Sequence, residues 1–260
     1  MAVTPEDARP PETVKSGLRT LLILEMLAMN QAPMGFAQLR DQLGVPKSSL
    51  HGLLTTLVAA KWVTFDRATG RYSVGPRALR VGVTYLERDA IVLAASPLVA
   101  HLRNQLDETV HLARLDGPDV VYLVSQESTH HLRSVSRIGR SVPAHATALG
   151  QVLLAQRTPE QVRQLLPETL VPLTAGTIVD VEVLLEHLAE IRERGFAVER
   201  GQNTPGLGCV AVPVPGRHPA MDAISCSVPL NRLPESRVGE LAEALLACAG
   251  ELGQTVPGFR

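Results

Sequence analysis

Apolar residues recur every three or four positions over the first quarter of the chain, and this spacing predicts three helices. They span about residues 14–29, 36–43 and 46–60. Gly44 is suited to end the second helix in the left-handed conformation. Pro46 is suited to the first turn of the third helix, where its missing N–H costs nothing.

Two β-rich runs follow at residues 62–65 and 71–74, and they flank a glycine-containing turn. Such a pair of runs predicts a hairpin. Three helices with a tight turn between the second and third, followed by a hairpin, predict a winged helix-turn-helix.

The pattern changes after residue 76. Residues 76 to about 107 predict two helical segments with a break near Ala95, Ser96 and Pro97, and the first segment is expected to link two domains. Strands are expected near residues 109–115, 119–125, 196–200, 207–214 and 220–228, and helices near 145–156, 159–166, 180–194 and 235–252. This mixture predicts an α+β fold with an antiparallel sheet. The expected parts are a disordered leader (1–12), a winged helix-turn-helix (13–75), a linker helix (76–95) and a C-terminal domain (96–254).

Charge is divided unevenly along the chain. Residues 1–88 hold 11 basic and 7 acidic side chains, a net charge of +4, and the remainder holds 14 and 19, a net charge of −5. A basic front and an acidic back are typical of a nucleic-acid module joined to a second domain.

The three cysteines, Cys209, Cys226 and Cys248, are widely spaced and odd in number, which disfavours a disulfide framework and favours a reducing compartment. Residues 1–12 lack the hydrophobic core of a signal peptide. The apolar run at residues 21–29 is short and contains Glu25, so it does not predict a membrane span. We therefore expect a cytoplasmic protein without a membrane anchor.

The third predicted helix has one apolar side and one polar side, as a helix in the major groove of DNA requires. Its first turn carries hydroxyl and ammonium groups beside free N–H groups, a combination that favours phosphate. Two arginines flank the hairpin turn, where they would reach the minor groove or the DNA backbone. The expected DNA-binding residues are Pro46, Lys47, Ser48, Ser49, His51, Gly52, Thr55, Arg67 and Arg71. A solvent-exposed amphipathic helix and a protein-binding winged helix are the alternatives.

Several blocks of the chain, in order, resemble the IclR family of bacterial transcriptional regulators. The resemblance extends from about Ser16 to Leu252. The similar blocks are VPKSSLH at 45–51, RYSVG at 71–75, GRSVPAHATALGQ at 139–151, RERGFAVE at 192–199, PGLGCVA at 205–211 and AISCS at 223–227.

This resemblance implies a winged helix-turn-helix joined by a linker helix to an effector-binding domain related to GAF and PAS folds. It also implies a homodimer or homotetramer on a palindromic operator of double-stranded DNA, a small organic acid or aromatic compound as the effector, and no cofactor. A repressor is the favoured mode of action. By position, the effector pocket would be lined by His131, Ala148, Leu149, Glu199, Cys209, Ser225 and Ser227.

The chain departs from the family pattern at two places. Gly52 stands where the family often has an arginine, so one base or phosphate contact is expected to be missing. Gly201 and Gln202 stand where the family often has two acidic residues, so the effector end of the pocket is expected to differ in charge and shape.

The expected pocket also has a chemical rationale. Ser225 and Ser227 alternate with apolar residues, which places both hydroxyls on one face of a strand. With the backbone N–H groups of Ala148 and Leu149 they would hold a carboxylate. Glu199 would repel an anion unless it were protonated or accepted a ligand hydroxyl.

Two other functions compete with that of a regulator. One is a scaffold that binds a protein through its winged helix. The other is a small hydrolase or thiol enzyme with an accessory winged helix, in which Cys209 would be the nucleophile. A buried structural thiol is the commoner role of such a cysteine. The histidines do not match the spacing of a metal site, and no catalytic motif accompanies them. We therefore expect a regulator rather than an enzyme, and no metal site.

Overall fold

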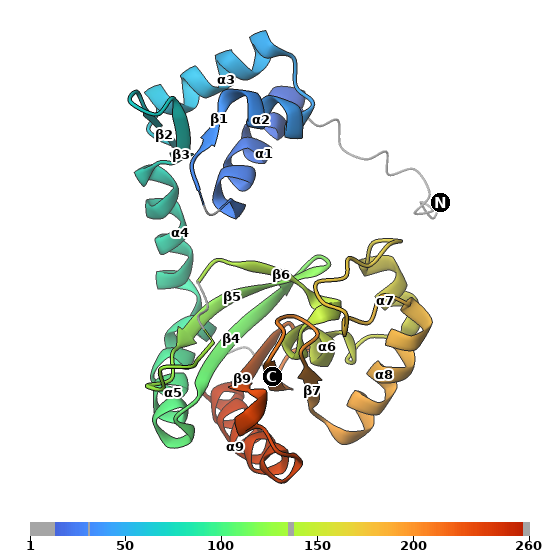
Figure 1. Ribbon diagram of the computed structural model, residues 1–260. Helices are drawn as coiled ribbons and strands as arrows, with labels where there is room; N and C mark the ends of the chain where they lie inside the picture. Colours follow the sequence, from blue (N-terminus) through green and yellow to red (C-terminus); the bar gives the residue numbers. More distant parts are fainter. Residues whose placement is uncertain (1–13, 31, 135–137, 257–260) are drawn as a thin grey trace, which may run out of the picture. The chain divides into compact units, whose positions relative to one another are not determined.

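The computed structural model describes residues 14–30, 32–134 and 138–256. The chain divides into two compact units, Met1–Tyr85 and Leu86–Arg260 (Figure 1). The leader predicted over residues 1–12 lies outside the described residues.

The N-terminal unit is a winged helix-turn-helix, as predicted. Its elements are α1 (Lys15–Met29), β1 (Met34–Gly35), α2 (Phe36–Leu43), α3 (Lys47–Ala59), β2 (Val63–Asp66) and β3 (Arg71–Val74). The three strands form one antiparallel sheet in the order β1-β3-β2. Strand β1 was not predicted, because two residues are too few to show an alternating pattern.

The turn between α2 and α3 follows from two residues. Gly44 adopts the left-handed conformation (φ 61°, ψ 26°) and donates its N–H to the carbonyl of Arg40, which ends α2. Pro46 occupies the N-cap position of α3 without a capping hydrogen bond, and the side chains of Leu50 and Leu54 are buried beneath that helix. These contacts fix the opposite side of α3 toward solvent.

Helices α4 (Pro76–Arg88) and α5 (Ala90–Leu106) meet at Asp89, so the break predicted near Ala95-Ser96-Pro97 is wrong. The Asp89 carboxylate caps α5 by accepting the N–H groups of Ile91 and Val92, at 3.0 and 3.1 Å. Pro97 lies inside α5 and leaves one helical hydrogen bond unmade. The helix continues because its buried face, including Val99, packs into the core of the C-terminal unit, and this packing outweighs the local propensity.

The C-terminal unit is built on a six-stranded antiparallel sheet in the order β6-β5-β4-β9-β8-β7. Its strands are β4 (Thr109–Asp116), β5 (Asp119–Gln126), β6 (Ser141–Pro143), β7 (Ala197–Arg200), β8 (Leu207–Pro213) and β9 (Asp222–Pro229). Its further helices are η1 (Ala144–Ala146), α6 (Ala148–Leu154), α7 (Pro159–Leu165), α8 (Val181–Arg194), η2 (Leu230–Arg232) and α9 (Glu235–Thr255). The α+β class and the antiparallel sheet are therefore confirmed.

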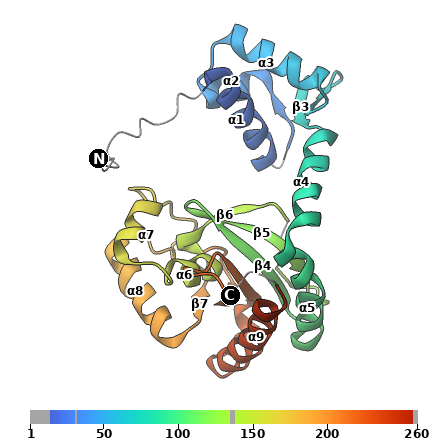
Figure 2. The same cartoon turned by 180° about the vertical axis from the view of Figure 1, so that it is seen from behind.

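Two hydrophobic cores lie on the two faces of this sheet. On one face, α5 and α9 lie side by side (Figures 1 and 2), over side chains such as Val210 and Ile224. On the other face, α6 and α8 cover side chains such as Ala211 and Ala223. Because neighbouring side chains point to opposite faces, Ser225 lies on the α6 side of the sheet.

The single helix predicted near 145–156 is divided into η1 and α6. Thr147 between them is extended (φ −131°, ψ 144°), and its Oγ1 accepts the N–H of Gly150 at 3.0 Å. The fold thus places an N-capping threonine at the start of α6, on the face of the sheet that carries Ser225.

Candidate DNA-binding surface and ligand cavity

The polar side of α3 is open to solvent. Leu50, Leu54 and Leu57 point into the core of the unit, which turns the opposite side outward. The predicted DNA-binding residues exposed in this way are Pro46, Lys47, Ser48, His51, Gly52 and Thr55, together with Arg67 and Arg71 of the wing. Ser49 is half-buried and accepts a hydrogen bond from Arg19 at 3.4 Å.

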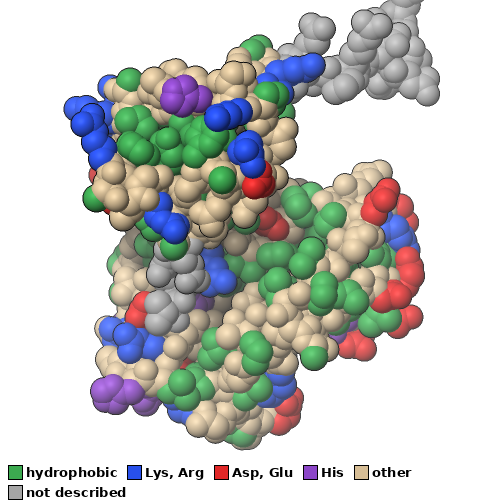
Figure 3. All heavy atoms as spheres, turned by 45° about the horizontal axis from the view of Figure 1, so that its top comes forward, with side chains coloured by type: hydrophobic (Ala, Val, Ile, Leu, Met, Phe, Trp, Pro, Cys, Tyr) green, Lys and Arg blue, Asp and Glu red, His purple; other side chains and the backbone are tan. Residues whose placement is uncertain are grey.

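Hydrogen bonds hold several side chains of the wing in place. Arg71 donates from Nη1 to the carbonyl of Pro33 at 2.8 Å, so part of its guanidinium ties β3 to the segment before β1. Asp66 fixes the wing turn by accepting from the N–H of Ala68 and the hydroxyl of Thr69. In Figure 3, which brings the top of Figure 1 forward, basic side chains lie around the edge of the visible face of this unit.

Gly52 lies in the exposed stripe of α3. A Cβ added there would meet no heavy atom within 4 Å. The packing of the unit therefore leaves room for a larger side chain, and the glycine is not required by the fold.

A cavity of about 320 Å³ opens in the C-terminal unit on the α6 side of the sheet. This volume is within the range of small-molecule sites. Six of the seven residues predicted for the effector pocket line it, namely Ala148, Leu149, Glu199, Cys209, Ser225 and Ser227. His131 is exposed and does not line it.

The cavity has further lining residues that the sequence did not indicate: Tyr122, Arg133, Ser134, Arg140, Thr147, Asn203, Thr204 and Leu207. Two of them carried a usable signal. Thr147 precedes the apolar run of α6, as an N-cap does, and Tyr122 is the one residue with a polar hydroxyl inside the apolar run of β5. The two arginines come from loops, where periodicity gives no information.

Three polar groups form the floor of the cavity. The register of β8 and β9 pairs Cys209 with Ser227, and the Sγ and Oγ atoms are 3.1 Å apart. Ser225 is 1% exposed, and its Oγ has no hydrogen-bond partner among the described residues. Because a buried hydroxyl without a partner is costly, Ser225 has an unmet capacity to bind a polar group in the cavity.

Glu199 is the acidic group of the cavity and is 2% exposed. Burial raises the pKa of its carboxyl group, although the N–H of Gln202 donates to it at 2.8 Å and hydrogen bonds from Cys209 and Asn203 also oppose the shift. The raised pKa favours the neutral acid, which weakens the repulsion of an anionic ligand.

Gln202, one of the departures from the family pattern, has a structural role. Its Oε1 accepts from Nε2 of Gln151 at 2.7 Å, and its carbonyl accepts the hydroxyls of Thr174 and Thr177 at 3.2 and 2.6 Å. These bonds hold the turn after β7, including Gly201 (φ 74°), against α6. An uncharged side chain here supports the wall of the cavity without adding negative charge.

Arg133 and Arg140 give the cavity a basic side. Arg133 pairs with Glu127 at 2.9 Å. Arg140 is exposed and forms no hydrogen bond or ion pair with another side chain among the residues that the structure describes. The lining therefore holds two guanidinium groups, one of them paired with Glu127, and one carboxyl group whose pKa is raised.

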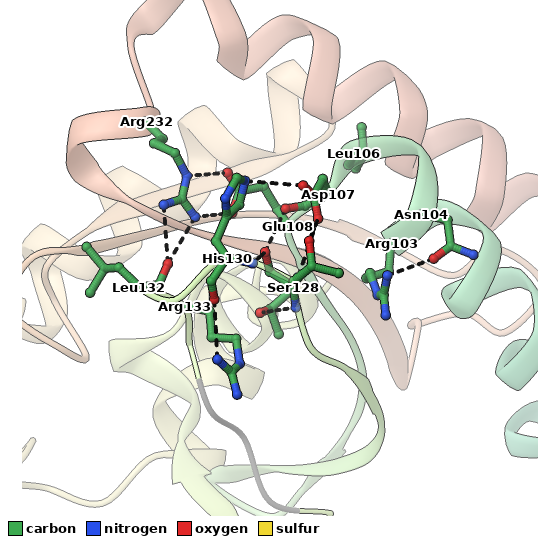
Figure 4. A network of polar contacts seen from close by, with 12 residues as sticks. Arg103, Asn104, Leu106, Asp107, Glu108, Ser128, His130, Leu132, Arg133 and Arg232 are labelled. Atoms are coloured by element: carbon green, nitrogen blue, oxygen red, sulfur yellow. Dashed lines mark hydrogen bonds and ion pairs between the residues drawn. The ribbon is translucent and has the colours of Figure 1, made fainter.

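The segment that carries Arg133 is held by a polar network (Figure 4). Asp107 accepts the hydroxyl of Thr129 at 2.7 Å, and its backbone carbonyl accepts that of Ser128 at 2.7 Å. Arg232 donates to the carbonyl of Leu132 at 3.2 Å. The start of β4 and the η2 turn thus position one wall of the cavity.

The site lacks the features of a thiol enzyme. Burial, together with the nearby Glu199, raises the pKa of the Cys209 thiol well above its usual value, so the thiolate nucleophile is not formed at neutral pH. Within the described ranges, no group of three His, Cys, Asp or Glu side chains is arranged to hold a metal ion. None of the described helices is long and apolar enough to cross a membrane.

A winged helix-turn-helix with a polar, exposed third helix, followed by a domain with a ligand-sized cavity, defines a DNA-binding transcriptional regulator with an effector-binding domain. Residues 83–254 match the family model for the C-terminal domain of the bacterial transcriptional regulator IclR, and residues 18–67 match the IclR helix-turn-helix domain. The chain belongs to the IclR family of bacterial transcriptional regulators. It is therefore a regulator and not an enzyme.

Individual relatives agree with this assignment. The chain is 32% identical over 262 residues to the transcriptional repressor IclR of Escherichia coli, covering 98% of this chain and 96% of that one. The crystal structure of an IclR regulator from Alicyclobacillus acidocaldarius matches with a TM-score of 0.82 at 25% identity, over 94% of this chain and 99% of that one. An IclR homologue from Microbacterium hydrocarbonoxydans, crystallised with 4-hydroxybenzoate, has the same fold (TM-score 0.73, 21% identity, 92% and 99% covered).

Proposed function

We propose that this regulator is a repressor whose affinity for its operator is changed by a small organic acid, aromatic or aliphatic, bound in the cavity of the C-terminal unit. The observation that carries the proposal is the buried hydroxyl of Ser225, which has no hydrogen-bond partner among the described residues and lies in a cavity with two arginines. The regulator would act in the cytoplasm, where bacterial DNA lies.

The charge of the cavity favours an anion. Arg133 and Arg140 are positively charged, and the raised pKa of Glu199 reduces the opposing charge. The hydroxyls of Ser225 and Ser227 supply further polar contacts, while Leu149 and Leu207 supply apolar ones. A small carboxylate with an apolar body, such as the 4-hydroxybenzoate bound by the homologue from M. hydrocarbonoxydans, combines these features.

The exposed side of α3 would enter the major groove. Lys47, Ser48, His51, Gly52 and Thr55 would face the bases and phosphates, with Pro46 and Ser49 at the start of the helix and Arg67 and Arg71 on the wing. Gly52 offers no side chain, so readout at that position would be carried by its neighbours. The exposure of this stripe supports the assignment.

We further propose that two copies bind a palindromic operator, as a homodimer or within a homotetramer. Helix α1 leaves Leu21 and Met29 exposed by 58% and 82%, and α4 leaves Leu79 exposed by 68%. Several large apolar side chains exposed on one unit fit an interface. A two-fold arrangement of helix-turn-helix units would match a palindromic site.

DNA binding is tested by fluorescence anisotropy with DNA from the region upstream of the regulator's own gene, over a series of salt concentrations. Replacing Lys47 with alanine should weaken binding. It should also reduce, by about one, the slope of the logarithm of the binding constant against the logarithm of the salt concentration. Lys15→Ala, at the exposed start of α1, is the matched control and should change neither. A failure of the wild-type protein to bind this DNA at low salt would contradict the proposal.

Ligand binding is tested with a panel of benzoate, 4-hydroxybenzoate, lactate and succinate, read by thermal shift and by calorimetry. An acid that binds should raise the melting temperature and change the operator affinity by about 5–150-fold. Arg140→Met should weaken binding of the acid but not of its amide counterpart. If none of these acids changes the melting temperature or the operator affinity, the proposed effector class is wrong.

A further inference from the structure

A buried ion cluster lies where helix α4 passes into helix α5. Asp89 is the residue between the two helices, and its carboxylate accepts from Arg114 of β4 at 2.5 Å (Nη1) and 3.3 Å (Nη2). The same guanidinium donates from Nε to Asp222 of β9 at 2.7 Å. One arginine therefore joins a helix end to the first residue of a strand.

The three side chains are largely removed from water. The exposed fractions are 17% for Arg114, 14% for Asp89 and 1% for Asp222. Burial raises the pKa of Asp222, although Arg114 opposes this shift, and the hydrogen bonds of Arg114 and of the α5 backbone hold the pKa of Asp89 below its usual value despite its burial. Both carboxylates accept hydrogen bonds from the guanidinium of Arg114. A change at any one of the three side chains therefore affects the other two.

The cluster shares its strands with the floor of the cavity. Asp222 begins β9, and Ser225 and Ser227 follow on the same strand. In the β4–β9 ladder Arg114 pairs with Asp222, and His111 pairs with Ser225. Ser225 lies three positions after Asp222 along the extended strand, a distance of roughly 10 Å.

We propose that Arg114 is the positioning residue that couples the cavity to the linker helix, by fixing the start of α5 to the strand that contacts the effector. Polar contact with Ser225 shifts β9, Asp222 moves with its strand, and Arg114 carries Asp89 along. Because Asp89 directly follows α4, a displacement at Asp89 is passed to that helix through the backbone. The inference rests on the proposed effector site and adds the route by which its occupancy is transmitted.

The test separates the coupling from the capping of α5. Asp89→Ser keeps a good N-capping side chain but removes both bonds to Arg114. Asp180→Ser is the matched control, because Asp180 caps α8 through the N–H groups of Glu182 and Val183 in the same way. Arg114→Met is the second variant, which removes the guanidinium itself but leaves two buried carboxylates.

Operator affinity is measured by anisotropy with and without each acid of the panel named above, and binding of the acid is measured separately by calorimetry. The coupling is the factor by which the acid changes the operator affinity. In wild type and Asp180→Ser we expect this factor to be about 5–150-fold. In Asp89→Ser we expect binding of the acid to be retained and the coupling to fall toward one. Hydrogen exchange at residues 86–95 should be faster in Asp89→Ser and Arg114→Met than in wild type.

The outcomes are distinct. If the wild-type protein binds an acid and responds to it, and Asp89→Ser responds equally, the coupling role of the cluster is wrong and the effector site stands. Unchanged exchange at residues 86–95 in both variants also overturns the positioning role. If the wild-type protein itself neither binds nor responds to the panel, the effector site fails and the inference fails with it.

Discussion

The Sγ atom of Cys209 lies 3.1 Å from the Oγ atom of Ser227 on the neighbouring strand, within hydrogen-bond distance. Both residues line the cavity. Burial and the nearby Glu199 raise the pKa of the Cys209 thiol. We predict that iodoacetamide modifies Cys209 in the native protein far more slowly than after unfolding in urea, since only the thiolate reacts. Mass spectrometry of the modified peptide measures the two rates. Fast modification of the native protein at neutral pH would contradict the assignment of a neutral, structural thiol.

Gly150 lies in the first turn of α6, against η1. A Cβ added there would lie 2.1 Å from the carbonyl oxygen of Ala144, which no side-chain motion can relieve. We predict that Gly150→Ala destabilises the C-terminal unit by at least about 2 kcal/mol. In Gly239→Ala of α9 the new methyl group meets nothing within 4 Å, and this control should be neutral or stabilising by up to about 1 kcal/mol. Urea unfolding followed by circular dichroism distinguishes the two, and equal stabilities would show that α6 can shift away from η1.

Glu108 is 1% exposed and is held between Arg232, at 2.7 Å, and Arg237, at 3.0 Å (Figure 4 shows the pair with Arg232). Replacing its carboxylate by an amide leaves the two guanidinium groups with one neutral acceptor oxygen in place of a buried counter-charge. We predict that Glu108→Gln lowers the free energy of unfolding by about 3 kcal/mol. Glu182→Gln is the control, because Glu182 pairs with Arg163 on the surface, where an ion pair contributes less than about 1 kcal/mol. If the two variants lost similar amounts of unfolding free energy, the negative charge of Glu108 would not be required for the stability of the C-terminal unit.

The order of helices and strands was largely predictable because it depends on local patterns. Gly44 ended α2 as predicted, and five of the six strands of the C-terminal sheet lie close to their expected positions. The sixth, β6, was not predicted, because its three residues are too few to show an alternating pattern. Pro97 was misjudged for a physical reason. Its cost to the helix is local and visible in the sequence, whereas the packing of α5 that offsets this cost depends on residues far along the chain.

The same distinction applies to the cavity. The family resemblance identified the lining residues that lie on strands and on α6, where the quoted sequence blocks fix their positions. Arg133 was not found, because its place depends on the contacts that Asp107 and Arg232 make with the loop before it. His131, two positions earlier, was predicted for the pocket, is exposed, and is not among the residues that line the cavity. In a loop held by distant side chains, sequence position alone does not show which residue faces a ligand.

His111 of β4 is 1% exposed, and burial lowers its pKa to about 4. Its Nδ1 lies 3.0 Å from the hydroxyl of Ser125, and its ring meets that of Tyr122 edge-on with centroids 5.1 Å apart. The imidazole is therefore neutral in the folded protein at pH 5, while in the unfolded chain, with a pKa near 6.5, it is protonated. Between about pH 6.5 and pH 4 the unfolded state binds more protons, so stability falls as the pH falls through this window.

We predict that the wild-type C-terminal unit loses roughly 2 kcal/mol of stability through His111 between pH 7.5 and pH 5. His111→Gln removes this contribution, although the variant is less stable at pH 7.5 because the packing against Tyr122 is lost. His145 and His187, whose pKa values burial also lowers, remain in both proteins and cancel in the comparison. Urea unfolding at a series of pH values measures the two slopes. If stability depends on pH in the same way in the two proteins, His111 takes up a proton within the folded sheet. The assignment of a neutral His111 imidazole would then be wrong.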